Sequence, residues 1–232
     1  ILTEIKIGYY NNCEYLIKIK DFFVYENTVY IVMNYYNQLD LRKYKKDKLI
    51  NKNNIHQIIF NILRGLQYLH INKVMHRDIK LGNIMMKNNN AFIGDFGTSR
   101  ILPENKYFTN TCIGTPYYLS PEIIGGDKYN AKVDIYSLGC LICELYYDKR
   151  PYNANNIYAL YKNVLESKKS IDIDSKTKIG NMINKMIDKE SYNRPLIDEV
   201  ISIFSSLNNK DYNRLYNKDE DFYNNLRKNM DI

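Results

Sequence analysis

The stretch VMHRDIKLGNIMM at residues 74–86 constrains the fold of this chain more than any other. Its polar and charged side chains are His76, Arg77, Asp78, Lys80 and Asn83. Apolar runs at 74–75 and 84–86 enclose them, and runs this short predict buried strands. The polar residues therefore lie in a loop held against a core, which is where binding and catalytic side chains are commonly placed.

The composition predicts a folded globular protein. With 232 residues, of which 45% are hydrophobic, the chain fits one large domain or two small lobes around a substantial core. A net charge of +7 would suit nucleic acid or an anionic membrane. However, the clearest basic run, 42–54, carries no nucleic-acid motif and favours a solvated lysine face over a binding patch. The longest apolar run, 138–147, is interrupted by Glu144 and is too short for a bilayer span, so we expect no membrane partner.

Four cysteines occur, at Cys13, Cys112, Cys140 and Cys143. The last two share a strongly apolar helical stretch, and no second Cys or His pair completes the four ligands of a zinc site. We expect them to pack in the core, which suits a reducing intracellular compartment.

The order of expected elements places two polar clusters opposite each other. Residues 28–36 are rich in β-branched and aromatic residues and predict a buried strand. From Asn53 to Leu69, apolar residues follow the three-four spacing of one helical face. Strands at 84–86 and 91–94, joined by a KNNN turn, form a hairpin that carries the 74–86 loop toward DFG at 95–97. A long segment without periodicity follows residue 98, helices run from Ala131 to about Leu207, and the tail is polar.

The polar clusters match the needs of phosphoryl transfer from ATP. That reaction requires a divalent metal held by oxygen ligands, a carboxylate that orients the attacking hydroxyl, and a cation near the moving phosphate. Asp78 can supply the carboxylate and Lys80 the cation. Asn83 and Asp95 can supply the metal ligands, and an amide at one of the two positions limits negative charge beside an anionic nucleotide.

HRDIKLGN and DFG resemble the catalytic and metal-binding loops of eukaryotic protein kinases. GTPYYLSPE (114–122), DIYSLG (134–139) and NRP (193–195) follow in the order of that family, and CIGTPYYLSPE is most similar to the NIMA-related (NEK) serine/threonine kinases. The resemblance implies an α+β, two-lobe fold, with ATP and Mg²⁺ as cofactors and Ser- or Thr-bearing proteins as substrates. It divides the chain into the remainder of an N-lobe (1–36, helix C to hinge), a mostly helical C-lobe (37–207) and a C-terminal tail (208–232).

The resemblance also implies roles for residues that bind ATP. Glu4 resembles the helix C glutamate that pairs with the ATP-binding lysine. Met33 matches the gatekeeper, so the backbone of Asn34 and Tyr36 should bind adenine. Asp40 matches an acidic residue near ribose or substrate.

Other matches imply regulatory and structural roles. Lys80 and Thr115 follow the serine/threonine pattern, and Arg77 resembles the arginine that a phosphate in the activation segment recruits, with Thr111 as the best-placed acceptor and Thr109 as the alternative. His76 would stack with Phe96 and Ile19 in a regulatory spine and has no acid-base role. Asp134 would hold the catalytic loop, and Arg194 would pair with Glu122.

The match to the family has gaps. No glycine-rich loop or lysine strand precedes Glu4 and the first residue is Ile, which predicts a truncated N-lobe and poor nucleotide binding by this fragment. Gly8 stands where the family has a large apolar residue, which predicts a gap and a helix cost of roughly 0.5–1 kcal/mol. Gln38 and Leu39 replace two glycines, and Ser120 replaces the commoner Ala.

Three functions compete at this stage. The first is a serine/threonine protein kinase, located inside the cell in the cytoplasm, nucleus or cytoskeleton. The second is a catalytically silent pseudokinase or scaffold with the same fold, and the third, nucleic-acid binding, rests on net charge alone. Asp78, Asn83 and Asp95 are all present, which favours the enzyme. The oligomeric state does not follow from the sequence.

Overall fold

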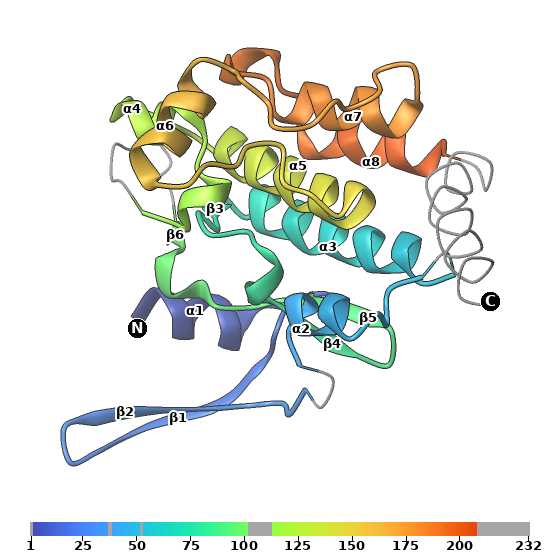
Figure 1. Cartoon of the computed structure of the whole chain (residues 1–232). Coiled ribbons are helices and arrows are strands. Elements are labelled where there is room, and N and C mark those ends of the chain that lie inside the picture. The colour runs from blue at the N-terminus through green and yellow to red at the C-terminus, as the bar shows by residue number, and fades with distance from the viewer. Residues whose placement is uncertain (1, 37–38, 52, 102–112, 208–232) are drawn as a thin grey trace, which may run out of the picture.

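The computed structural model describes residues 2–36, 39–51, 53–101 and 113–207. The expected tail at 208–232, together with Gln38, Thr109, Thr111 and Cys112, lies outside the described residues. Figure 1 shows a helical body from which one hairpin extends. The helices are α1 (Leu2–Tyr10), α2 (Leu41–Lys46), α3 (Ile55–Ile71), α4 (Pro121–Gly125), α5 (Lys132–Tyr147), α6 (Ile157–Leu165), α7 (Lys178–Met186) and α8 (Ile197–Ser205). The strands are β1 (Ile19–Tyr25), β2 (Thr28–Met33), β3 (Val74–Met75), β4 (Ile84–Lys87), β5 (Asn90–Ile93) and β6 (Arg100–Ile101), with short 3₁₀ turns at 81–83, 96–98, 116–118 and 191–193.

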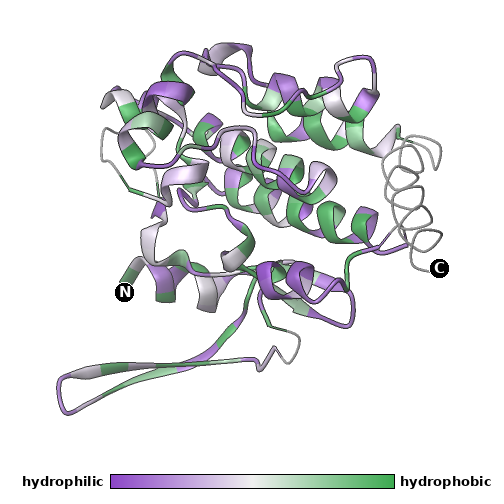
Figure 2. Ribbon diagram, viewed as in Figure 1, coloured by the Kyte–Doolittle hydropathy of each residue, from purple (hydrophilic) through white to green (hydrophobic). Residues whose placement is uncertain are grey.

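The extended hairpin consists of β1 and β2, which pair antiparallel, with Phe23 opposite Tyr30. The sequence did not predict β1. The expectation that β2 is buried is wrong, because its residues are mostly exposed; the helix α1 packs against the other strand of this two-stranded sheet, β1. The rings of Phe23 and Tyr30 instead stack on each other at 5.1 Å. Figure 2 shows hydrophobic residues distributed along the hairpin.

Gly8 does not leave the gap that the sequence predicts. It is buried in α1, and a Cβ atom built on it would lie 2.5 Å from Cδ1 of Ile19. Ile19, at the start of β1, is itself buried and fills the space that a large side chain on the helix would occupy. The contact between helix and strand is therefore kept, with the bulky partner on the strand.

We predict that Gly8→Leu and Ile19→Ala compensate each other. Gly8→Leu alone should destabilise the protein, since overpacking typically costs roughly 1–3 kcal/mol. Ile19→Ala alone should cost roughly 2–5 kcal/mol through the cavity that it leaves. In the double variant the introduced leucine occupies that cavity, so urea unfolding should show a favourable coupling of about 0.5–3 kcal/mol. Pairing Gly8→Leu with Ile183→Ala in α7 is the control, and equal coupling in both pairs would contradict the proposed contact.

The main core lies in the helical body. α3 and α5 contribute to one cluster of buried side chains, α8 lies against α3, and α7 lies against α5. The apolar face predicted for 53–69 is the buried face of α3. Cys140 and Cys143 are fully buried on α5, as expected for core residues, and burial raises the pKa of the Cys143 thiol to about 12. Among the described residues, no helix is both long and apolar enough to cross a bilayer.

The predicted hairpin around the polar loops is formed by β4 and β5, with Ile84 opposite Ile93. Its turn consists of Asn88 and Asn89, both with positive φ, a conformation that asparagine tolerates and that suits tight hairpins. The sequence predicted no strand after residue 98, but Arg100–Ile101 forms β6 by pairing with β3. Two residues give no periodic signal, so only their partner reveals this strand.

Candidate active site

The carboxylate of Asp78 is the centre of the site. It is buried, and its two oxygens accept hydrogen bonds from Lys80 Nζ (2.6 Å), Thr115 Oγ1 (2.8 Å) and Asn83 Nδ2 (3.0 Å). Burial by itself raises the pKa of the Asp78 carboxyl, but these hydrogen bonds and the charge of Lys80 bring it below its ordinary value. Asp78 is therefore ionised near neutral pH and is held in one orientation.

Asp134 anchors the loop that carries Asp78. This residue is in the first turn of α5 and fully buried. Its carboxylate accepts the backbone N–H groups of His76 (2.9 Å) and Arg77 (2.8 Å) and contacts His70 Nε2 at 2.9 Å. Burial raises the pKa of Asp134, but the hydrogen bond and charge of His70 lower it to a value below the ordinary one. The buried helix α5 thus holds the catalytic loop in place through the Asp134 carboxylate.

His76 is enclosed by the core and both of its ring nitrogens are engaged. Nε2 lies 2.9 Å from the carbonyl oxygen of Gly94, and Nδ1 accepts the N–H of Asp78 at 3.3 Å. Burial lowers the pKa of His76, which favours the neutral ring. The ring of Phe96 meets it edge-on at 5.8 Å, while Ile19, the third residue expected in the spine, packs against Gly8.

Asn83 and Asp95 form a candidate metal pair. The backbone N–H of Gly94 donates to the carbonyl of Asn83 at 2.9 Å, which brings the DFG turn against the catalytic loop. Because Asn83 Nδ2 donates to Asp78, its Oδ1 is left for a cation, and Asp95 is exposed. Neither oxygen group is paired with another described residue. Two such oxygen ligands fit Mg²⁺, whose remaining positions are commonly taken by water and phosphate.

The residues expected around the nucleotide lie in three places. Glu4 is on α1, and its Oε2 and Asp95 Oδ1 lie 3.7 Å and 3.3 Å from the position of a Cβ atom on Gly97. No described basic residue forms an ion pair with Glu4. Met33 ends β2 and is exposed, and Asn34 and Tyr36 follow it in the connection to α2.

Asp40 has a structural contact that the sequence did not predict. Its Oδ1 accepts the N–H of Lys43 at 2.8 Å, so it is the N-cap of α2. The other oxygen of its carboxylate lies 3.6 Å from Arg42.

Arg77 and Thr98 link the catalytic loop to the segment after DFG. Arg77 has a positive φ of 68° and donates from Nε to the carbonyl of Thr98 at 2.7 Å. The Thr98 hydroxyl donates back to the carbonyl of His76 at 3.2 Å. Thr111, the expected phosphate acceptor, falls outside the described part of the chain, so its position relative to Arg77 stays a prediction.

Glu122 and Arg194 form a bidentate ion pair. Arg194 Nη1 and Nη2 each donate to the Glu122 carboxylate at 2.7 Å, and the Arg194 side chain is fully buried. The guanidinium also donates to the carbonyls of Asp188, Lys189 and Lys132. The pair therefore ties the end of the activation segment to the helices that follow.

We predict that Arg194→Ala destabilises the fold strongly. Removing one partner of a buried ion pair typically costs roughly 3–5 kcal/mol, because the remaining charge is left uncompensated. Lys43→Ala, which removes an exposed pair with Asp47, is the control and should cost less than about 1 kcal/mol. Denaturant unfolding measures both, and equal losses would show that the Arg194 pair contributes no more than a surface pair.

His70 is the site residue that sequence reasoning missed. It lies at the end of α3, 64 residues before its partner Asp134. An isolated histidine at the end of an apolar helix carries no signal of such a pairing, which depends on how α3 and α5 come together.

Known proteins resemble this chain over most of its length. The family described as the protein kinase domain matches residues 1–206. The chain therefore belongs to the protein kinase domain family. It is 35% identical over 179 residues to the human serine/threonine-protein kinase Nek5, which covers 75% of this chain and 25% of that protein.

Two further relatives give the same result. A probable serine/threonine-protein kinase nek3 of Dictyostelium discoideum is 35% identical over 208 residues, 85% of this chain and 18% of that protein. Mouse Nek4 is 32% identical over 181 residues, 76% of this chain and 23% of that protein. Within the protein kinases, the similarity is thus to the NIMA-related group, and the chain spans a quarter or less of the length of these relatives.

Proposed function

We propose that this chain is the catalytic domain of a serine/threonine protein kinase, which transfers the γ-phosphate of ATP to Ser or Thr hydroxyls of proteins. The observation that carries the proposal is the environment of Asp78. Its ionised carboxylate already accepts the hydroxyl of Thr115, a group of the kind that an acceptor residue would present. The named function of the relatives supports the same reaction class.

Asp78 and the residues around it each have a separate role in the proposed reaction. Asp78 orients the acceptor hydroxyl and accepts its proton as the oxygen becomes a nucleophile. Asn83 holds the carboxylate in place, and Lys80 lies where its charge can stabilise the transferring phosphoryl group. Thr115 must release Asp78 Oδ1 when a substrate hydroxyl takes that position.

ATP and Mg²⁺ are the cofactors that the proposal requires. When bound, the metal neutralises phosphate charge and the nucleotide supplies the phosphoryl group. Asn83 Oδ1 and the Asp95 carboxylate would hold the cation, and the backbone of Asn34 and Tyr36 would hold the adenine. Glu4 and Asp40 complete the proposed nucleotide site.

A silent pseudokinase is the second candidate function. It would need no ordered hydrogen bonds around Asp78, yet the carboxylate has three donors. Asn83 and Asp95, the candidate oxygen ligands for a cation, are also present in this chain. We therefore prefer the enzyme.

Asp78→Asn tests the proposal directly. The amide keeps the size of the side chain but cannot accept the proton, so kcat should fall by roughly 10²- to 10⁴-fold. The assay follows ³²P transfer from ATP to a mixed peptide library in the full-length protein, with Asp127→Asn on the surface as the control. Wild-type protein that transfers no phosphate would support the pseudokinase, and unchanged transfer by Asp78→Asn would remove Asp78 from the mechanism.

A second test concerns the acceptor residue. We expect Thr98, a stiff β-branched residue beside the catalytic loop, to leave room for the methyl group of an acceptor threonine. Threonine peptides should therefore be used at least as well as serine peptides, and Thr98→Leu should shift kcat/KM toward serine by roughly 1–3 kcal/mol. Thr98→Val is the control, because it removes the hydroxyl bonded to His76 but keeps the shape. A strong serine preference before mutation, or the same shift in both variants, would contradict the steric argument.

A further inference from the structure

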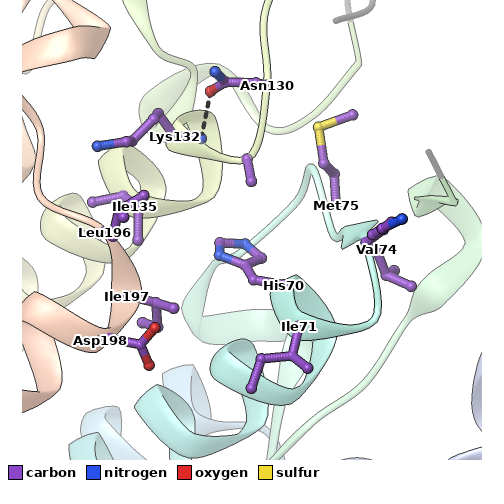
Figure 3. A pocket seen from close by; sticks show the side chains of 12 residues that line it. His70, Ile71, Val74, Met75, Asn130, Lys132, Ile135, Leu196, Ile197 and Asp198 are labelled. Carbon is purple, nitrogen blue, oxygen red and sulfur yellow. Dashed lines mark hydrogen bonds between the residues drawn. The ribbon is translucent and has the colours of Figure 1, made fainter. Parts of the chain in front are cut away.

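A cavity of about 410 Å³ lies behind the catalytic loop, away from Asp78. It opens between the end of α3, β3, the start of α5 and the start of α8, and Figure 3 shows the His70 ring among side chains of these elements. This volume is within the range of small-molecule sites, roughly 300–1,000 Å³. None of the residues proposed to hold nucleotide or metal lines it.

Apart from Lys73, the polar side chains in its wall already have partners inside the protein. His70 contacts Asp134, the Lys132 ammonium donates to the carbonyl of Arg194, and the Asp198 carboxylate accepts the amide of Gln67. A ligand would therefore gain little from hydrogen bonds with these groups, because each would first have to be released.

Asn130 accepts the backbone N–H of Lys132, and most of the remaining wall is apolar. Its apolar side chains are Ile71, Val74, Met75, Ala131, Ile135, Leu196 and Ile197. Two of them, Ile71 and Leu196, are 68% and 57% exposed, so apolar surface continues to the mouth of the cavity. Burying this surface under an apolar group would be favourable.

Lys73 places a positive charge at the mouth of the cavity. It lines the cavity and is exposed, and its ammonium group forms no ion pair or hydrogen bond with the described residues. Asp198, the only acidic residue of the lining, lies across the cavity from Val74, which follows Lys73 in the chain (Figure 3). An anionic group beside Lys73 would thus be kept apart from the carboxylate of Asp198.

We propose that this cavity is a binding site for a small amphiphile that has one apolar body and one carboxylate. The apolar body lies against Met75, Ile135 and Ile197, and the carboxylate faces Lys73. This site is separate from the kinase function proposed above and does not depend on it.

The position of the cavity couples its occupant to the catalytic loop. Val74 and Met75 immediately precede His76, and His70 shares the Asp134 carboxylate with the backbone N–H groups of His76 and Arg77. A ligand that moves the His70 ring changes the hydrogen bonds of Asp134. Binding in the cavity should therefore change the environment of the His76 and Arg77 amides even when no ligand occupies the nucleotide site.

The test uses the full chain with ¹³C-methyl labels on Ile and Met and ¹⁵N in the backbone. Sodium octanoate and octylammonium chloride are titrated below their micelle concentrations, and 1-octanol below its solubility limit. We expect octanoate to shift the methyl signals of Met75, Ile135 and Ile197 and the amide signals of His76 and Arg77. It should bind about two- to fivefold more tightly than octanol, the effect of one exposed ion pair, and more tightly than octylammonium.

Two variants separate the contributions of charge and cavity. Lys73→Asn removes the charge and suits the positive φ of 57° at this position, so octanoate affinity should fall to that of octanol. Lys48→Asn is the matched control, since Lys48 is also exposed with a φ of 57° but does not line the cavity. Ala131→Leu should fill the cavity and abolish binding of all three probes.

Three results would overturn the proposal. One is the absence of methyl shifts with octanoate, and another is equal affinity for the three probes. The third is unchanged octanoate binding in Lys73→Asn, a surface substitution that leaves the core intact. Methyl shifts without amide shifts at His76 and Arg77 would overturn the coupling to the catalytic loop.

Discussion

The carboxylate of Asp134 is the constraint on which the active-site region depends. A buried carboxylate is stable only when donors surround it, and here two backbone N–H groups and the His70 ring do so. Because α5 is enclosed by the main core, the packing of that helix fixes the position of this charge. The same carboxylate holds the catalytic loop. A change that destabilises the helical body should therefore also displace Asp78.

These bonds also hold a loop that would not keep its shape alone. Arg77 and Asp95 have positive φ values of 68° and 60°, and such conformations in residues other than glycine cost of the order of 1–3 kcal/mol each. Asp134 fixes the first turn, and the bond between Gly94 and Asn83 fixes the approach to the second. The strained turns thus lie directly beside Asp78 and at Asp95, the two carboxylates that the proposed reaction would use.

The N-terminal part, α1 and the β1–β2 hairpin, has fewer buried contacts than the helical body. Ile19 supplies the bulk that Gly8 lacks, so α1 and β1 remain in contact. The β1–β2 hairpin gains its order from strand pairing and from ring stacking between Phe23 and Tyr30, while most of its apolar side chains remain exposed. Its composition therefore predicts a strand correctly and burial wrongly, since burial depends on which layers are present.

The sequence by itself determined the elements with strong local signals: the apolar face of α3, the asparagine turn between β4 and β5, and the motifs that identify a kinase domain. These follow from periodicity, turn chemistry and residue order, which short stretches of chain contain. Only the tertiary structure decided that His70 meets Asp134, that β6 pairs with β3 and that Ile19 covers Gly8. These depend on contacts between separate segments of the chain, so residue identity alone could not specify them.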